Sequence, residues 1–288
     1  MFDLFFKLHP AVCVLYYLFV IILTVGSKSP LVSAAAFFSS FIFFFIIKGS
    51  KALRYFFILF PVFCVFSFLN LFFSHYGQTV LFNFLGRPCT KEALLYGMNM
   101  AFMFCSLIMI FCCYGIELSC DKFVFLFSKI APSFSIMLVM VFRLIPFVSK
   151  KYSDVCDGRR GAGFSDGAKN RIVNLGLTFS SGLEETLETA GSMACRGFGT
   201  AKRTHFLNYK FTFRDFFLLI LIFVLFFICS FCFAKGCVKI DFYPVIKLYW
   251  KPDVCFFAGS CSFLILCFIP VLLYVKEALS WHLSALKI

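Results

Sequence analysis

Six apolar runs, each about as long as a bilayer is thick, constrain the fold of this chain more than any other feature of its sequence. A helix needs about 20 mostly apolar residues to cross the hydrocarbon core of a membrane. The runs predict membrane spans over residues 11–26, 31–47, 55–73, 93–114, 213–234 and 254–275. We therefore predict an all-α, polytopic integral membrane protein with about six transmembrane helices.

Two further apolar stretches fit a membrane span less well. Residues 80–85 are too few to cross a bilayer. Residues 123–148 are enough, but charged residues and prolines interrupt them at Lys129, Pro132, Arg143 and Pro146. A hydrophobic stretch with basic residues along it is typical of a helix at the membrane interface. We expect an interfacial or partly buried helix there.

The basic residues predict which way the spans run. Lys and Arg number 27 against 14 Asp and Glu. They concentrate in the short connection of residues 48–54 and in a long polar segment, residues 149–214. Cytoplasmic connections of membrane proteins are enriched in Lys and Arg. We therefore expect both connections, and with six spans both termini, on the cytoplasmic side of the membrane.

Composition and motifs exclude several classes of protein. With 61% hydrophobic residues, the chain is too apolar to be disordered or a soluble nucleic-acid binder, so we expect no nucleic-acid partner. Most of the 15 cysteines lie in apolar runs, where Cys acts as a small hydrophobic residue. The four histidines are scattered, and residues 161–169 lack the Gly-Lys-Ser/Thr ending of a phosphate-binding loop. We expect no catalytic residue, metal or nucleotide in this chain.

The polar segment is the predicted location of function, and it divides the chain into three parts. Residues 1–122 are predicted to hold about four spans, residues 123–212 amphipathic and cytoplasmic helices, and residues 213–288 two more spans. Within the middle part, one helix is expected to begin inside residues 123–148 and to end between Gly158 and Gly161. A second helix is expected from near Asn170 to Arg196.

The second of these helices carries two local patterns. Ser181 followed by Glu184 is a capping-box pattern. Helical spacing also places four apolar or small residues on one stripe, namely Leu183, Leu187, Ala190 and Ala194. The small residues of this stripe suit the close approach of another helix.

Both helices are predicted to end at an arginine followed by a glycine. The sequences are Arg159-Arg160-Gly161 and Cys195-Arg196-Gly197. Glycine supplies the left-handed position after a helix, and arginine in the last turn complements the helix dipole, so two ordinary helix ends are one interpretation. Arg160 and Arg196, 36 residues apart, also present two planar guanidinium groups suited to carboxylates or carbonyls of a partner.

These residues resemble the T component of energy-coupling factor (ECF) transporters. The second coupling motif of that family shows Ala-Arg-Gly-Tyr-Gly followed by a basic Arg-Thr. The block from Met193 to Thr204 is similar to it, and so are two upstream segments that precede the first motif, Ile130-Ala131-Pro132 and Phe142-Arg143-Leu144-Ile145-Pro146.

The resemblance departs from the family pattern at the residue before each motif arginine. The family usually has Ala before the motif arginine, and here Cys195 and Arg159 take that place. The first motif arginine is therefore Arg159 or Arg160, and Gly161 directly after it favours Arg160.

The resemblance implies a non-enzymatic energy coupler. T components hold a substrate-binding S component in the bilayer and sit on two cytoplasmic ABC-type ATPase subunits, which bind the ATP; the T component itself binds no cofactor. ATP-driven closure moves the coupling helices, and the S component releases its vitamin or metal ion, such as cobalt, inside. The implied coupling residues are Arg159, Arg160, Gly161, Cys195, Arg196 and Gly197.

Two other functions remain open from the sequence. The first is the permease subunit of a conventional ABC transporter, which usually offers one cytoplasmic coupling segment where this chain offers two arginine-ended helices. The second is an integral-membrane enzyme acting on lipid, which needs a cluster of Asp, Glu or His at the membrane face.

Overall fold

The computed structural model describes residues 8–27, 29–73, 79–84, 87–128, 131–164, 167–200, 209, 211–236, 240–241, 247–248 and 254–285. The chain divides into two compact units. The first comprises Met1–Ser119 with Lys210–Ile288, and the second comprises Cys120–Tyr209. The boundaries expected from the sequence, 122/123 and 212/213, lie three residues further along the chain at each junction.

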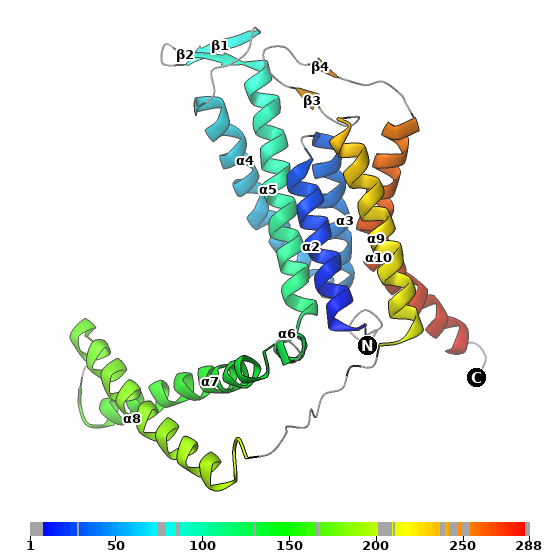
Figure 1. Cartoon of the computed structure of the whole chain (residues 1–288). Helices are drawn as coiled ribbons and strands as arrows, with labels where there is room; N and C mark the ends of the chain where they lie inside the picture. Colours follow the sequence, from blue (N-terminus) through cyan, green and yellow to red (C-terminus); the bar gives the residue numbers. More distant parts are fainter. Residues whose placement is uncertain are drawn as a thin grey trace. The chain divides into compact units, whose positions relative to one another are not determined.

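The described residues of the first unit form a bundle of six helices (Figure 1). They are α2 (Pro10–Gly26), α3 (Pro30–Lys48), α4 (Lys51–Phe73), α5 (Lys91–Glu117), α9 (Phe213–Ala234) and α10 (Val254–Ala285). These correspond to the six spans that the sequence predicts. In the bundle α5 packs against α4, α3 and α2, whereas α9 packs against α2 and α10.

Six helices of the described chain are long and apolar enough to cross a membrane, so this is an all-α, multi-pass membrane protein. Five of them, α3, α4, α5, α9 and α10, are predicted spans. The sixth is α7 (Pro132–Gly161), which the sequence analysis expected at the interface. Helix α2 has only 17 residues, about 25 Å of helix, which is at the lower end of the spanning range.

Two short antiparallel strand pairs lie in connections between helices of the bundle, at the end opposite the start of α2 (Figure 1). One pairs β1 (Val80–Phe84) with β2 (Arg87–Thr90), and the other pairs β3 (Ile240–Asp241) with β4 (Lys247–Leu248). The sequence analysis excluded residues 80–85 as a span but did not predict a strand there.

Threonine side chains set the start of two helices of the bundle. The Thr90 hydroxyl accepts a hydrogen bond from the backbone N–H of Ala93, 3.3 Å away, at the start of α5. At the start of α9, Thr212 and Asp215 form a capping box, and the Asp215 carboxylate accepts from both the backbone N–H and the hydroxyl of Thr212. Such caps satisfy donors that a helix leaves unpaired in its first turn.

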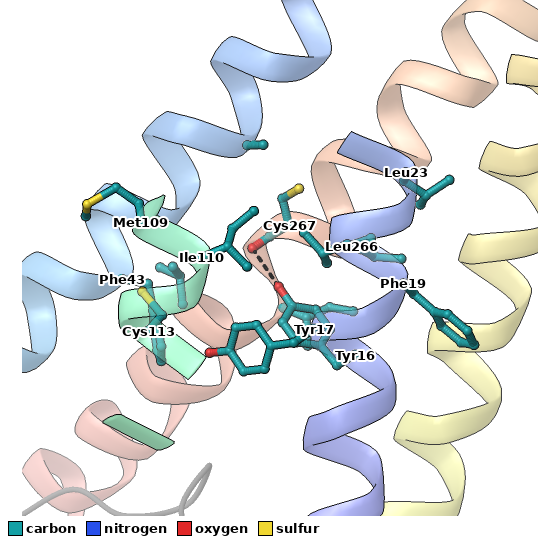
Figure 2. Close-up of a cluster of buried hydrophobic side chains, with 14 of the residues drawn as sticks. Tyr16, Tyr17, Phe19, Leu23, Phe43, Met109, Ile110, Cys113, Leu266 and Cys267 are labelled. Carbon is teal, nitrogen blue, oxygen red and sulfur yellow. Dashed lines mark hydrogen bonds between the residues drawn. The ribbon is translucent and has the colours of Figure 1, made fainter. Parts of the chain in front are cut away.

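Hydroxyl groups from two other helices bond the backbone of α10 close to a proline. Pro270 lies inside α10, where proline lacks an N–H and disrupts the helix hydrogen bonds around it. The carbonyl of Cys267, one turn earlier, accepts hydrogen bonds from Ser39 Oγ of α3 (2.8 Å) and from Tyr16 Oη of α2 (3.3 Å; Figure 2). Neighbouring helices thereby satisfy backbone groups that the apolar bundle cannot leave unpaired.

Helices α4 and α5 approach closely at a glycine. A Cβ atom added to Gly97 of α5 would lie 2.7 Å from the backbone oxygen of Ser67 in α4, a distance that requires the helices to separate. Near this contact, Ser33 Oγ of α3 donates a 3.0 Å hydrogen bond to the side-chain oxygen of buried Asn99 in α5. Small and polar residues at helix contacts are typical of membrane bundles.

The second unit contains three helices, α6 (Cys120–Ser128), α7 and α8 (Ala168–Cys195). The apolar run of residues 123–148 is therefore divided between α6 and α7 instead of forming one helix. Pro132 is the first residue of α7, and Ala131 before it has φ −140° and ψ 83°, because a residue preceding proline is disfavoured in the helical region. Ser135 Oγ then donates 3.2 Å to the Val124 carbonyl and ties α7 to α6.

The predicted capping box at Ser181 is wrong. Helix α8 is continuous through this residue, and Ser181 Oγ donates to the carbonyl of Thr178 at 3.3 Å. A serine inside a helix commonly bonds back to the preceding turn. The Ser181 and Glu184 pattern therefore marks no helix start.

Candidate functional site

The C-terminal end of α7 differs from the prediction. Gly161 is still helical, Ala162 is the C-cap with φ −83°, and the left-handed residue is Gly163 with φ +85°. The expectation that Gly161 supplies the left-handed position is therefore wrong. The helix extends beyond Arg159-Arg160-Gly161, because a glycine at position 163 allows the chain to reverse there.

The C-terminal end of α8 follows the prediction. Cys195 is the last helical residue, Arg196 is the C-cap, and Gly197 has φ +76°. A side chain at Gly197 would also approach the Thr200 hydroxyl to 3.1 Å. Glycine is needed here for its backbone conformation.

Both ends carry the same pair of backbone hydrogen bonds. Phe164 N–H donates to the Arg159 carbonyl (3.1 Å), and Gly163 N–H donates to the Arg160 carbonyl (3.0 Å). At the end of α8, Phe198 N–H donates to the Met193 carbonyl (3.1 Å), and Gly197 N–H donates to the Ala194 carbonyl (3.0 Å). This pair of bonds defines a Schellman motif.

The shared hydrogen bonds fix which residues of the two ends are equivalent. Gly163-Phe164 corresponds to Gly197-Phe198, with a separation of 34 residues. In this register Arg196 corresponds to Ala162, and Arg160 lies two positions earlier. The prediction that the two Arg-Gly pairs occupy the same place at their helix ends is therefore wrong.

Arg159 is engaged in contacts within the second unit. Its Nη1 donates 2.8 Å to Oδ1 of Asn174 and its Nη2 donates 3.4 Å to Oδ1 of Asn170, both in α8. The guanidinium also lies over the Phe164 ring, 4.6 Å from its centroid. Asn174 is 5% exposed and donates through Nδ2 to Cys156 Sγ at 3.2 Å. Arg159 therefore holds the end of α7 against the first turns of α8.

Arg160 and Arg196 lie on the surface of the second unit. Both are exposed, as is Cys195. Arg160 Nη1 lies 3.4 Å from Oδ1 of Asp157, and the two side chains are 58% and 65% exposed. An exposed ion pair of this kind contributes about 0–1 kcal/mol, so a partner can replace Asp157 at little cost. Of the two candidate arginines of the first end, the geometry favours Arg160 for contact with a partner.

The stripe predicted on α8 is open. Leu183 and Leu187 are 50% and 73% exposed, and Ala190 and Ala194 are exposed as well. Alongside the stripe, Glu185 Oε2 lies 3.8 Å from Lys151 Nζ of α7. Helix α7 therefore reaches α8 beside the stripe and leaves the stripe itself uncovered within the second unit.

The sequence analysis missed three residues of this site: Gly163, Phe164 and Asn174. The first two had a signal, a Gly-Phe pair that recurs as Gly197-Phe198. Asn174 had none, because its role depends on how α7 and α8 pack. Within the described ranges, no group of three or more His, Cys, Asp and Glu residues is arranged to hold a metal ion.

Comparison with known proteins assigns no family to this chain. No protein-family model matches the sequence, and no curated protein matches it. The function is therefore inferred from residues 159–161 and 195–197 and from the geometry of the ends of α7 and α8.

Proposed function

We propose that this chain is the T component of an ECF-type importer, a non-enzymatic membrane subunit that couples two cytoplasmic ABC-type ATPase subunits to a substrate-binding S component. The observation that carries the proposal is the pair of exposed arginines, Arg160 and Arg196, at the ends of two helices that pack against each other. A subunit driven by two ATPases needs two such ends.

The basic residues from Lys150 onward in the second unit support a cytoplasmic location for the ends of α7 and α8. Positive residues accumulate in cytoplasmic connections, and exposed Lys150, Lys169 and Arg171 accompany the two arginines. In the proposed topology both termini also lie in the cytoplasm of a prokaryotic cell. The helices of the first unit cross the cell membrane and contact the S component, which selects the vitamin or metal ion.

The contacts between α7 and α8 support their movement as one body. Arg159 joins the end of α7 to Asn170 and Asn174 of α8, and Lys151 and Glu185 add a second link. Hydrogen bonds to a charged group contribute about 1.5–3 kcal/mol each. In the proposed mechanism, ATP-driven closure of the ATPase pair shifts the two helix ends together, and the S component reorients in response.

The test is purification of the full chain from its native membranes in mild detergent, with identification and counting of the proteins that accompany it. We expect two ATPase subunits and one S component per copy of this chain. The Arg160→Ala, Arg196→Ala double variant should lose the ATPases, because truncating one side of a buried charged contact weakens binding by about 30-fold or more.

The matched control is Arg171→Ala, which removes the same charge from an exposed position of α8. This variant should keep its ATPases. Retention of ATPases and of full uptake by the double variant would show that these arginines do not dock. Two copies of the chain per ATPase pair would favour the permease of a conventional ABC transporter, and lipid-modifying activity without ATPases would favour the enzyme.

A further inference from the structure

We propose that Phe164 and Phe198 are the equivalent anchors by which the two helix ends insert into two like grooves of the ATPase pair, with Arg160 and Arg196 contacting the groove rims. This inference rests on the proposed function, since it concerns how the same partner is recognised. In this proposal the element that recurs at both helix ends is the Gly-Phe pair instead of the arginine.

The backbone hydrogen bonds place the two phenylalanines at the same position of their helix ends. Each phenylalanine directly follows the left-handed glycine and donates its N–H to the carbonyl five residues earlier. The arginines do not share a register, because Arg196 is a C-cap and Arg160 lies two residues before one. Two like grooves require like elements in like places, and the phenylalanines meet that requirement.

Both phenylalanines are also exposed. A Schellman motif commonly packs its second residue after the cap against the last helical turn, and Arg159 provides such a contact for Phe164. Even so, Phe164 is 53% exposed and Phe198 is 52% exposed. About half of the surface of each residue is therefore exposed, and aromatic residues that enter a pocket are typical hot spots of protein interfaces.

The chemistry around the two rings is also alike. An exposed guanidinium lies close in the sequence to both, at Arg160 and at Arg196. Each end therefore offers an exposed ring and, within four residues of it, an exposed cation. The complementary surface is an apolar pocket with carboxylate or carbonyl groups at its edge. A partner with two copies of one subunit supplies that surface twice.

The test uses a photoreactive phenylalanine analogue placed at position 164, 198 or 179 of the full chain in its complex. Phe179 is the matched control, because it is 70% exposed but lies in the middle of α8. On irradiation, we expect positions 164 and 198 to crosslink to the ATPases, through the same peptide of that subunit, and position 179 to give no such product. A purely structural role in the helix end produces no crosslink.

Binding measurements complete the test. Phe164→Ala and Phe198→Ala should each weaken ATPase binding by about 30-fold, with unchanged helix content, whereas Phe179→Ala should bind normally. If the unaltered chain carries no ATPases, the proposed function fails. If it carries them but either position 164 or 198 gives no crosslink, or the two reach different peptides, the anchor inference alone is overturned.

Discussion

Arg159 and Arg160 are neighbours in the sequence, yet the structure predicts opposite consequences for their removal. Arg159 joins two helices, whereas Arg160 faces solvent beside Asp157. Arg159→Ala should therefore loosen the α7–α8 pair. Arg160→Ala should affect the pair much less and should impair contact with a partner.

The magnitude follows from the contacts of the Arg159 guanidinium. Its 2.8 Å bond to Asn174 contributes about 1.5–3 kcal/mol, as is usual for a charged donor. The bond to Asn170 is longer, 3.4 Å, and is weaker. The contact with the Phe164 ring adds about 0.5–1 kcal/mol. Loss of the side chain should cost about 3 kcal/mol, against about 0–1 kcal/mol for Arg160.

Hydrogen exchange of the full chain in detergent measures this difference. Where exchange requires local opening, about 3 kcal/mol of lost stability speeds it by about 100-fold. We expect that increase in Arg159→Ala for the amides at the end of α7 and the start of α8, and a clearly smaller change in Arg160→Ala. Equal exchange in the two variants, or faster exchange in Arg160→Ala, would refute the role assigned to Arg159.

Two pairs of glycine substitutions test the end of α7 and the packing of α4 against α5. Gly163→Ala should destabilise the end of α7 by about 1–2 kcal/mol, because a left-handed residue with a Cβ is strained. Gly161→Ala should be neutral or stabilising by about 0.5–1 kcal/mol, because Gly161 is helical with open space around it. Amide exchange at the end of α7 should therefore be faster in Gly163→Ala and unchanged or slower in Gly161→Ala, and the opposite result would contradict the helix end described. Gly97→Ala should cost about 1–3 kcal/mol through overpacking against Ser67. Its thermal unfolding in detergent should fall below that of Gly115→Ala, whose site has nothing within 4 Å, and equal unfolding temperatures would exclude the close approach of α4 and α5.

The apolar spans could be predicted because length and hydropathy are local properties. All six predicted runs are helices, with ends within four residues of those expected except in α10, which continues ten residues beyond the predicted end. The second helix of the polar segment was also predicted well, because Gly197 directly follows its last turn. These features depend on consecutive residues, so one sequence suffices to find them.

The end of α7 could not be predicted to the residue, because two glycines compete for it. Gly161 and Gly163 both fit the left-handed position, and the preceding arginine favoured the first. In the structure Gly163 takes it, and Arg159 packs against Asn170 and Asn174 of the next helix, 11 and 15 positions away. Sequence patterns do not contain such a contact.

The central claim is that this chain couples two ATPase subunits to one membrane partner. The most direct measurement is the mass of the complex purified from native membranes in mild detergent, which gives the number of copies of each subunit. The account predicts one copy of this chain, one S component and two ATPase subunits. A complex with two copies of this chain per ATPase pair, or a chain that purifies without any ATPase, would contradict it.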